Sequence, residues 1–241
     1  MKYLKWAFFA LLLIIGIAIF CIIIFSEKKP EGKSGNNADA LAQKMLKSLN
    51  YDAFTKTKYF RWSFPRGHHY FFNQNTNQAI IKWDEHKVIM QLDTQEGQAF
   101  TDETLITDDA QRKALMDKAW SYWCNDSFWM FAPFKVFDPG TTRKIVEEDG
   151  KEALLIEYKS GGVTPGDSYL WILDENYRPT GYKMWTSIIP VKGMYSSWEN
   201  WEQHNGAYYA TNHNMKMELK MDNFLASDTL ADFGYQTNPF Q

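Results

Sequence analysis

The sequence predicts a mainly β domain of the α+β kind, an antiparallel sheet curled over helices, preceded by one membrane helix. About ten strand-like segments follow one another at intervals of roughly 8–15 residues, as in antiparallel folds. Aromatic residues make up 17% of the 241 residues, and aromatic side chains favour strands and fill wide interiors. An uninterrupted apolar run, Trp6 to Phe25, opens the chain.

This apolar run predicts a transmembrane signal anchor. As a helix its 20 residues would extend about 30 Å, the thickness of a bilayer core. We expect a single pass through a bacterial inner membrane with the body in the periplasm. The alternative is a cleaved signal that leaves a soluble periplasmic protein. The run ends without a small-x-small site, and bulky Phe20 before Cys21 makes a poor lipobox, which favours the anchor. Lysines flank both ends, so the positive-inside rule decides the orientation only weakly.

The predicted organisation is a short tail over residues 1–5, the anchor over 6–25, a polar linker over 26–37 and one domain over 38–241. Without the lysines that precede the anchor, the net charge of −3 becomes −5, and no basic block is present. The chain therefore lacks the charge pattern of a nucleic-acid-binding protein. Its two cysteines, Cys21 and Cys124, lie on opposite sides of the linker and cannot form a disulfide within the domain.

The first half of the domain reads as a helix followed by strands. Asn37 or Asp39 can cap a helix over 38–49. Its apolar stripe consists of Leu41, Met45, Leu46 and Leu49. Beyond this helix, apolar and polar residues alternate with a period of two, which predicts strands over 59–64, 69–73, 78–84 and 87–92.

A second helix follows, capped by Thr107 or Asp108 and ending near Asn125. Strands then resume, with hairpin signals at Asp149-Gly150 and Asn205-Gly206. They are expected over 144–148, 152–159, 167–173, 180–188, 196–202, 208–213 and 216–223.

Histidine and aspartate side chains are the candidates for catalysis. Adjacent His68 and His69 should point to opposite faces of a strand, and His204 and His213 are expected at the surface. Asp126, Asp138 and Asp167 read as turn-forming residues that lie apart from one another and from His68. We find no metal-ligand spacing, phosphate loop or dinucleotide motif. The sequence therefore predicts no cofactor, no metal and no enzyme, with an envelope hydrolase as the minor alternative.

The segment from Trp120 to Phe137 is unusually rich in aromatic residues. It predicts either a packed plug of the core or a lid over an apolar cavity. The candidate cavity residues are Trp120, Trp123, Phe128, Trp129, Phe131 and Phe134 from this segment, and Trp62, Met90 and Trp171 from the strands.

Four motifs support a family resemblance: Trp123 to Gly140, Val163 to Tyr169, Trp198 to Trp201, and Asn205 to Tyr208. They resemble a family of bacterial envelope proteins, usually exported or lipid-anchored, over roughly Leu41 to Phe233. That family is thought to share the fold of the LolA/LolB lipoprotein carriers and the mycobacterial lipid carriers. The resemblance implies an unclosed antiparallel half-barrel whose helix-covered cavity takes acyl chains, as in the characterised carriers.

Two functions follow as expectations. The first is non-catalytic binding of a lipid or a lipidated ligand, such as a lipoprotein acyl chain, in the concave face. The second is a structural or protein-interaction module of the envelope whose aromatic side chains simply fill the core.

Overall fold

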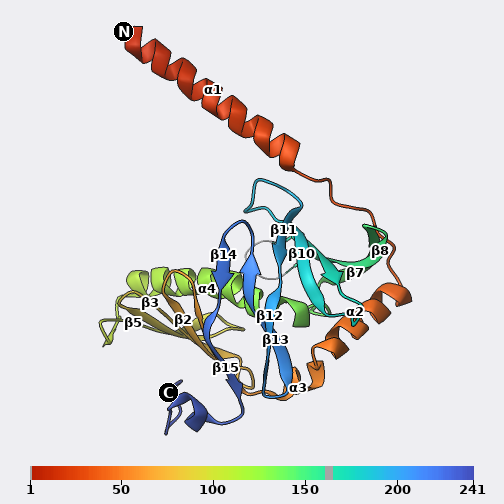
Figure 1. Ribbon diagram of the computed structural model, residues 1–241. Helices are drawn as coiled ribbons and strands as arrows, with labels where there is room; N and C mark the ends of the chain where they lie inside the picture. Colours follow the sequence, from red (N-terminus) through yellow and green to blue (C-terminus); the bar gives the residue numbers. More distant parts are fainter. Residues whose placement is uncertain (1, 161–164) are drawn as a thin grey trace.

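The computed structural model describes residues 2–160 and 165–241. This part of the chain forms three antiparallel sheets, none of them closed into a barrel, together with four α-helices (Figure 1). The prediction of a mainly β fold with unclosed antiparallel sheets and a few helices is confirmed. The carrier-like half-barrel is a finer statement and stays a prediction. Val163 and Thr164 of the second motif lie outside the described residues.

The largest sheet has seven strands in the order β15-β1-β2-β3-β4-β5-β6. Burial alternates along β1 because one face of the sheet packs on the core. The C-terminal end of the chain covers the other face, where Phe233 and Phe240 contact Phe71 at ring-centroid distances of 5.0 and 5.3 Å. The strands are β1 Tyr59–Phe64, β2 His68–Asn73, β3 Gln78–Trp83, β4 His86–Gln91, β5 Glu96–Thr101, β6 Thr104–Leu105 and β15 Asp222–Ser227.

Two smaller sheets complete the body, a five-stranded one in the order β11-β10-β9-β8-β7 and a three-stranded one in the order β12-β13-β14. Their strands are β7 Thr141–Glu148, β8 Lys151–Tyr158, β9 Ser168–Leu173, β10 Pro179–Trp185, β11 Met194–Ser197, β12 Glu199–His204, β13 Ala207–Asn214 and β14 Glu218–Lys220.

Two predicted strands are each divided in the structure. The segment 196–202 becomes β11 and β12 because Trp198 turns back to β10, donating its amide to the Thr180 carbonyl at 2.8 Å. The segment 216–223 becomes β14 and β15, which belong to different sheets. Met217, which lies within the predicted strand, is 77% exposed in the turn before β14. Strand β5 was not predicted, because Glu96, Gly97 and Gln98 give it a polar start.

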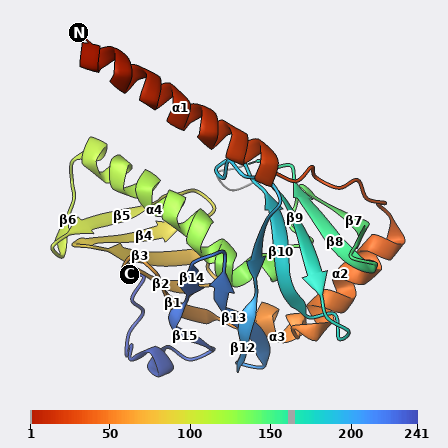
Figure 2. The same ribbon diagram turned by 45° about the horizontal axis from the view of Figure 1, so that its top comes forward.

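Helix α1 (Lys2–Phe25) extends away from the sheets (Figures 1 and 2). Most of its described apolar side chains are exposed. Within the described chain, no helix is long and apolar enough to cross a membrane. The anchor over residues 6–25 stays a prediction.

The segment after α1 is held against the edge of the five-stranded sheet. Lys33 forms an antiparallel bridge with Ile145 of β7 through two backbone hydrogen bonds of 2.9 Å. A Cβ atom on Gly32 would lie 2.8 Å from the Ile145 carbonyl oxygen, so the close approach requires glycine. The segment predicted as a polar linker is thus docked on the domain.

An ion pair reinforces this docking. Lys29 Nζ lies 2.5 Å from Glu157 Oε1 on β8, and Lys144 Nζ lies 2.8 Å from the other carboxylate oxygen. Although burial raises the pKa of Glu157, these two ammonium groups hold it at about 2.

Helix α2 (Asn36–Ser48) presents its predicted stripe of four apolar residues to the core, each at most 5% exposed. It begins after Gly35, one residue before the first predicted cap. The short helix α3 (Tyr51–Lys56) was not predicted. It follows Asn50, whose left-handed φ of 55° separates it from α2.

Candidate functional site

Helix α4 (Asp109–Phe131) organises the interior. Asp108 caps it by accepting a hydrogen bond from the Gln111 amide at 2.9 Å, as predicted. The predicted end near Asn125 is wrong, because the helix continues to Phe131. Burial of its last turns between the sheets outweighs the weak helix propensity of their aromatic residues. Asp126 is therefore a buried helical residue, not a turn residue.

One side of α4 packs closely on the seven-stranded sheet. Trp123 lies 5.0 Å from Phe72 and 5.7 Å from Trp62, measured between ring centroids. Phe131 lies 5.1 Å from Phe60 and 5.3 Å from Trp62. All five side chains are at most 9% exposed, so this interface is filled. The other predicted site residues buried in the core, outside the cavity described next, are Met90, Phe134 and Trp171.

The other side of α4 faces the five-stranded sheet and borders a cavity of about 510 Å³. Here Phe128 lies 4.6 Å from Tyr169 between ring centroids, and Trp129 lies 5.9 Å from Tyr182. Figure 2 shows α4 passing from the seven-stranded sheet towards β9 and β10. The predicted site residues that line the cavity are Trp120, Trp123, Phe128, Trp129, Asp138 and Asp167.

Two carboxylates lie in the wall of this cavity. Asp167 is 5% exposed and accepts hydrogen bonds from the Ser187 amide at 3.1 Å and the Tyr169 hydroxyl at 3.4 Å. Asp138 is half-exposed and forms an ion pair with Lys135 at 2.8 Å. The cavity thus combines aromatic walls with a few polar groups, which is the usual make-up of a small-molecule site.

Two hydroxyl groups of the wall have spare hydrogen-bonding capacity. Thr186 is 4% exposed, and neither its Oγ1 nor the buried Oη of Tyr158 has a hydrogen-bond partner among the described residues. A buried hydroxyl without a partner costs free energy that a bound polar group could recover.

The buried tyrosine and cysteine side chains of the cavity favour their neutral forms. Burial raises the pKa values of Tyr158 and Tyr169, and Asp138 and Asp167 respectively raise them further. Burial also raises the pKa of the Cys124 thiol to about 12, against the opposing effect of Lys135. A protonated thiol is a poor nucleophile, so this cysteine does not equip the cavity for covalent catalysis.

His68 and Asp126 contact each other, contrary to the predicted separation. His68 Nδ1 lies 2.7 Å from Asp126 Oδ2, which also accepts a hydrogen bond of 2.5 Å from the Tyr70 hydroxyl. His68 is 8% exposed and Asp126 1%, whereas the neighbouring His69 is exposed. The contact forms because strand β2 packs against α4 at Asp126, five residues before Phe131, a tertiary relation that spacing along the chain does not reveal. Neither residue lines the cavity.

The expectation for His213 is also wrong. It is fully buried on β13 against Trp129 and Trp198, with ring centroids 5.2 and 4.4 Å away. His204 is half-buried and pairs with Glu202 at 3.1 Å. Within the described residues, no group of three or more His, Cys, Asp or Glu side chains could hold a metal ion.

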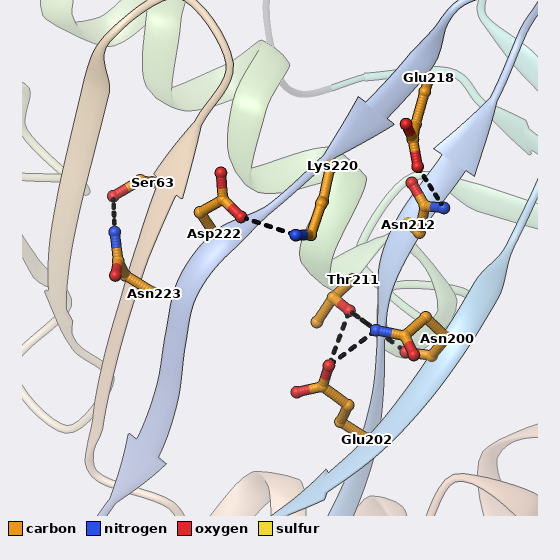
Figure 3. A network of polar contacts seen from close by, with 9 residues as sticks. All are labelled: Ser63, Asn200, Glu202, Thr211, Asn212, Glu218, Lys220, Asp222 and Asn223. Atoms are coloured by element: carbon orange, nitrogen blue, oxygen red, sulfur yellow. Dashed lines mark hydrogen bonds and ion pairs between the residues drawn. The ribbon is translucent and has the colours of Figure 1, made fainter.

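A second polar cluster lies on the three-stranded sheet and β15 (Figure 3). The Asn200 amide donates to Glu202 at 2.7 Å and to the Thr211 hydroxyl at 2.6 Å, and Asn212 donates to Glu218 at 3.0 Å. The bond from Asn200 to Thr211 joins β12 to β13 and the bond from Asn212 to Glu218 joins β13 to β14, so both support the pairing of these strands. The other pairs drawn are Lys220 with Asp222 and Asn223 with Ser63.

Sequence reasoning missed most of the cavity wall, including nearly all of the side that the five-stranded sheet contributes. Tyr158, Tyr169, Tyr182 and Thr186 lie on or beside β8, β9 and β10, where each reads as an ordinary strand residue. One sequence signal for this side of the wall was available: the motif from Val163 to Tyr169, which contains both Asp167 and Tyr169.

Comparison with the models of known protein families finds no match for this chain, and comparison with curated proteins finds none either.

Proposed function

We propose that this protein binds an amphipathic lipid or a lipidated ligand, without catalysis, in the cavity between α4 and the five-stranded sheet. The observation that carries the proposal is the cavity itself, about 510 Å³ and bordered by aromatic side chains. Ligand pockets in proteins are typically about 300–1,000 Å³.

The chemistry of the wall suits a ligand with an apolar chain and a polar group. Burying four CH₂ groups of a chain contributes about 3 kcal/mol at ~0.8 kcal/mol each. Phe128 and Trp129 offer apolar contact for such a chain. The hydroxyl groups of Thr186 and Tyr158 would pair with its polar group.

We further propose that α1 attaches the protein to a membrane with the body outside the cytoplasm. The support is the run of 20 apolar residues and the exposure of apolar side chains such as Phe20 and Ile23, at 64% and 68%. Alkaline carbonate washing of membranes tests the attachment. Release of a shortened chain would show instead that the segment is a cleaved signal.

Binding is tested with a fluorescent fatty-acid probe and the delipidated full chain. Ser121 is exposed on α4 and lines the cavity, so Ser121→Trp should obstruct it and weaken binding at least tenfold. Ala114→Trp is the matched control, because Ala114 is exposed on the same face of the same helix two turns earlier and does not line the cavity.

Saturable binding by the wild type and the control, with loss in Ser121→Trp, would support the proposal. No binding by the wild type, or equal binding by both variants, would contradict it. Absence of binding would favour the structural or protein-interaction module. Thr186→Val tests the polar contact, because it removes the hydroxyl with almost no change in shape.

One observation favours a second candidate, an envelope hydrolase. The contact between His68 and Asp126 orients an imidazole in the manner of many general bases. A rate of ester hydrolysis by the wild type that is lost in His68→Gln would establish it. His68 and Asp126 are buried and do not line the cavity, so lipid binding is the better-supported function.

A further inference from the structure

We infer that the loop over 186–193 and the turn over 214–218 form a membrane-docking surface that brings one wall of the cavity to the lipid headgroups. The inference rests on the proposed lipid binding and membrane attachment. It adds the source of the ligand, the bilayer surface, and the route by which the ligand enters.

The loop is clamped to the base of α1. The Glu27 amide donates to the Lys192 carbonyl at 2.8 Å, and the Lys192 amide donates to the Ser26 hydroxyl at 3.0 Å. The Trp185 indole donates to the Glu27 carbonyl at 2.8 Å. A Cβ atom on Gly193 would lie 2.6 Å from Glu27 Cβ, so the two segments are in direct contact.

The turn between β13 and β14 also contacts the base of α1. Lys216 Nζ lies 6.0 Å from the ring centroid of Phe25, the last residue of α1. Met217 beside it is 77% exposed, and Ile188 at the tip of the loop is 64% exposed. The loop and the turn that carry these residues thus both contact the base of α1, where the apolar helix meets the body.

The charges at this end suit a bilayer surface that carries anionic lipids. Lys28 and Lys216 are exposed, and Lys192 lies in the loop between them. The acidic groups here are Glu27, which is paired with Lys183 at 2.7 Å, exposed Glu218, and buried Asp167, which accepts a hydrogen bond from the Ser187 amide at 3.1 Å. Exposed apolar side chains with lysines nearby are typical of surfaces that seat in the headgroup layer.

The same loop is a wall of the cavity. Thr186, Ile188 and Ile189 all line it, and Lys192 fixes the loop by donating its ammonium group to the Thr186 and Ile189 carbonyls. A ligand that leaves the bilayer beside Ile188 would meet the Thr186 hydroxyl without passing through bulk water.

Nanodiscs containing the full chain test this surface. In a background of Cys21→Ser and Cys124→Ala, an environment-sensitive fluorophore is attached at Ile188→Cys, Met217→Cys or Glu175→Cys. Glu175 is exposed in the turn at the opposite end of β10, about 20 Å away along a seven-residue strand, and is the matched control.

We expect blue-shifted emission and several-fold quenching by headgroup-spin-labelled lipid at positions 188 and 217, but not at 175. Water-like emission without quenching at 188 and 217, in discs that demonstrably contain the protein, would overturn the inference. Failure of the chain to enter discs would instead refute the membrane attachment. A shift without lipid quenching would indicate a protein contact and would also overturn the inference.

Ligand transfer provides a second readout. Met217 does not line the cavity, so Met217→Asp should leave binding of a probe delivered in detergent unchanged. It should slow uptake of the same probe from anionic vesicles at least fivefold, whereas Glu175→Ala should not. Equal uptake by the two variants would contradict loading from the bilayer surface.

Discussion

The two sides of helix α4 use the same aromatic chemistry with opposite results. Towards the seven-stranded sheet, Phe131 packs against Phe60 and Trp62 of β1, all three rings are buried, and that interface is filled. Towards the five-stranded sheet, Phe128 and Trp129 meet tyrosines across a cavity of about 510 Å³. A high aromatic content therefore does not decide between a filled core and a lined cavity, since one helix serves both.

The largest effect we expect comes from truncating a ring on the filled side. Phe131→Ala should lower the free energy of unfolding by about 3–5 kcal/mol, because the close packing leaves a void. Phe128→Ala, three residues earlier and beside the existing cavity, should cost less than about 2 kcal/mol. Chemical unfolding of the full chain, followed by tryptophan fluorescence, measures both. Equal losses would mean that the two sides are packed alike.

His213, which lies against Trp129 between the two sides, should make stability depend on pH. Burial lowers its pKa from 6.5 to about 4, although the Ser197 carbonyl opposes the shift. As the pH falls below 6.5, the unfolded chain binds a proton before the folded chain does. Neutral His213 therefore makes its full contribution to the free energy of unfolding above pH 6.5. That contribution decreases by up to about 3 kcal/mol as the pH falls from 6.5 through about 4.

His213→Gln is the control for this pH effect. The difference in unfolding free energy between wild type and variant should narrow as the pH decreases across that window. A difference that stays constant from pH 7 to pH 4 would show that the folded protein protonates His213 normally.

The smallest effect should come from Asp138 at the exposed edge of the cavity. Asp138 forms an ion pair with Lys135, and each of the two side chains is 42% exposed. Asp138→Ala should therefore change the unfolding free energy by less than about 1 kcal/mol. The turn should persist, because the Thr141 hydroxyl donates to the main-chain carbonyl of residue 138 at 2.8 Å. Probe exchange measured by stopped flow should change more than stability. A large loss of stability would show that Asp138 holds the turn.

Patterns of period two and helical stripes were enough to predict most strands, the buried face of α2 and the Asp108 cap. They failed where tertiary contacts decide the outcome. The end of α4 depends on burial between two sheets, and the contact of His68 with Asp126 depends on how β2 crosses that helix. The cavity depends on which rings meet, and no periodicity along the chain distinguishes Phe128 from Phe131.

The bridge between Lys33 and Ile145 has a practical consequence for preparing this protein. Strand β7 is the last strand of its sheet, and residues around 33 occupy part of its free edge. Uncovered edge strands recruit other chains and promote aggregation. A soluble version cut at Ala38 would expose that edge, whereas one that begins at Ser26 would retain its cover. The boundary for expression therefore lies at the end of α1, some ten residues before the domain that the composition suggests.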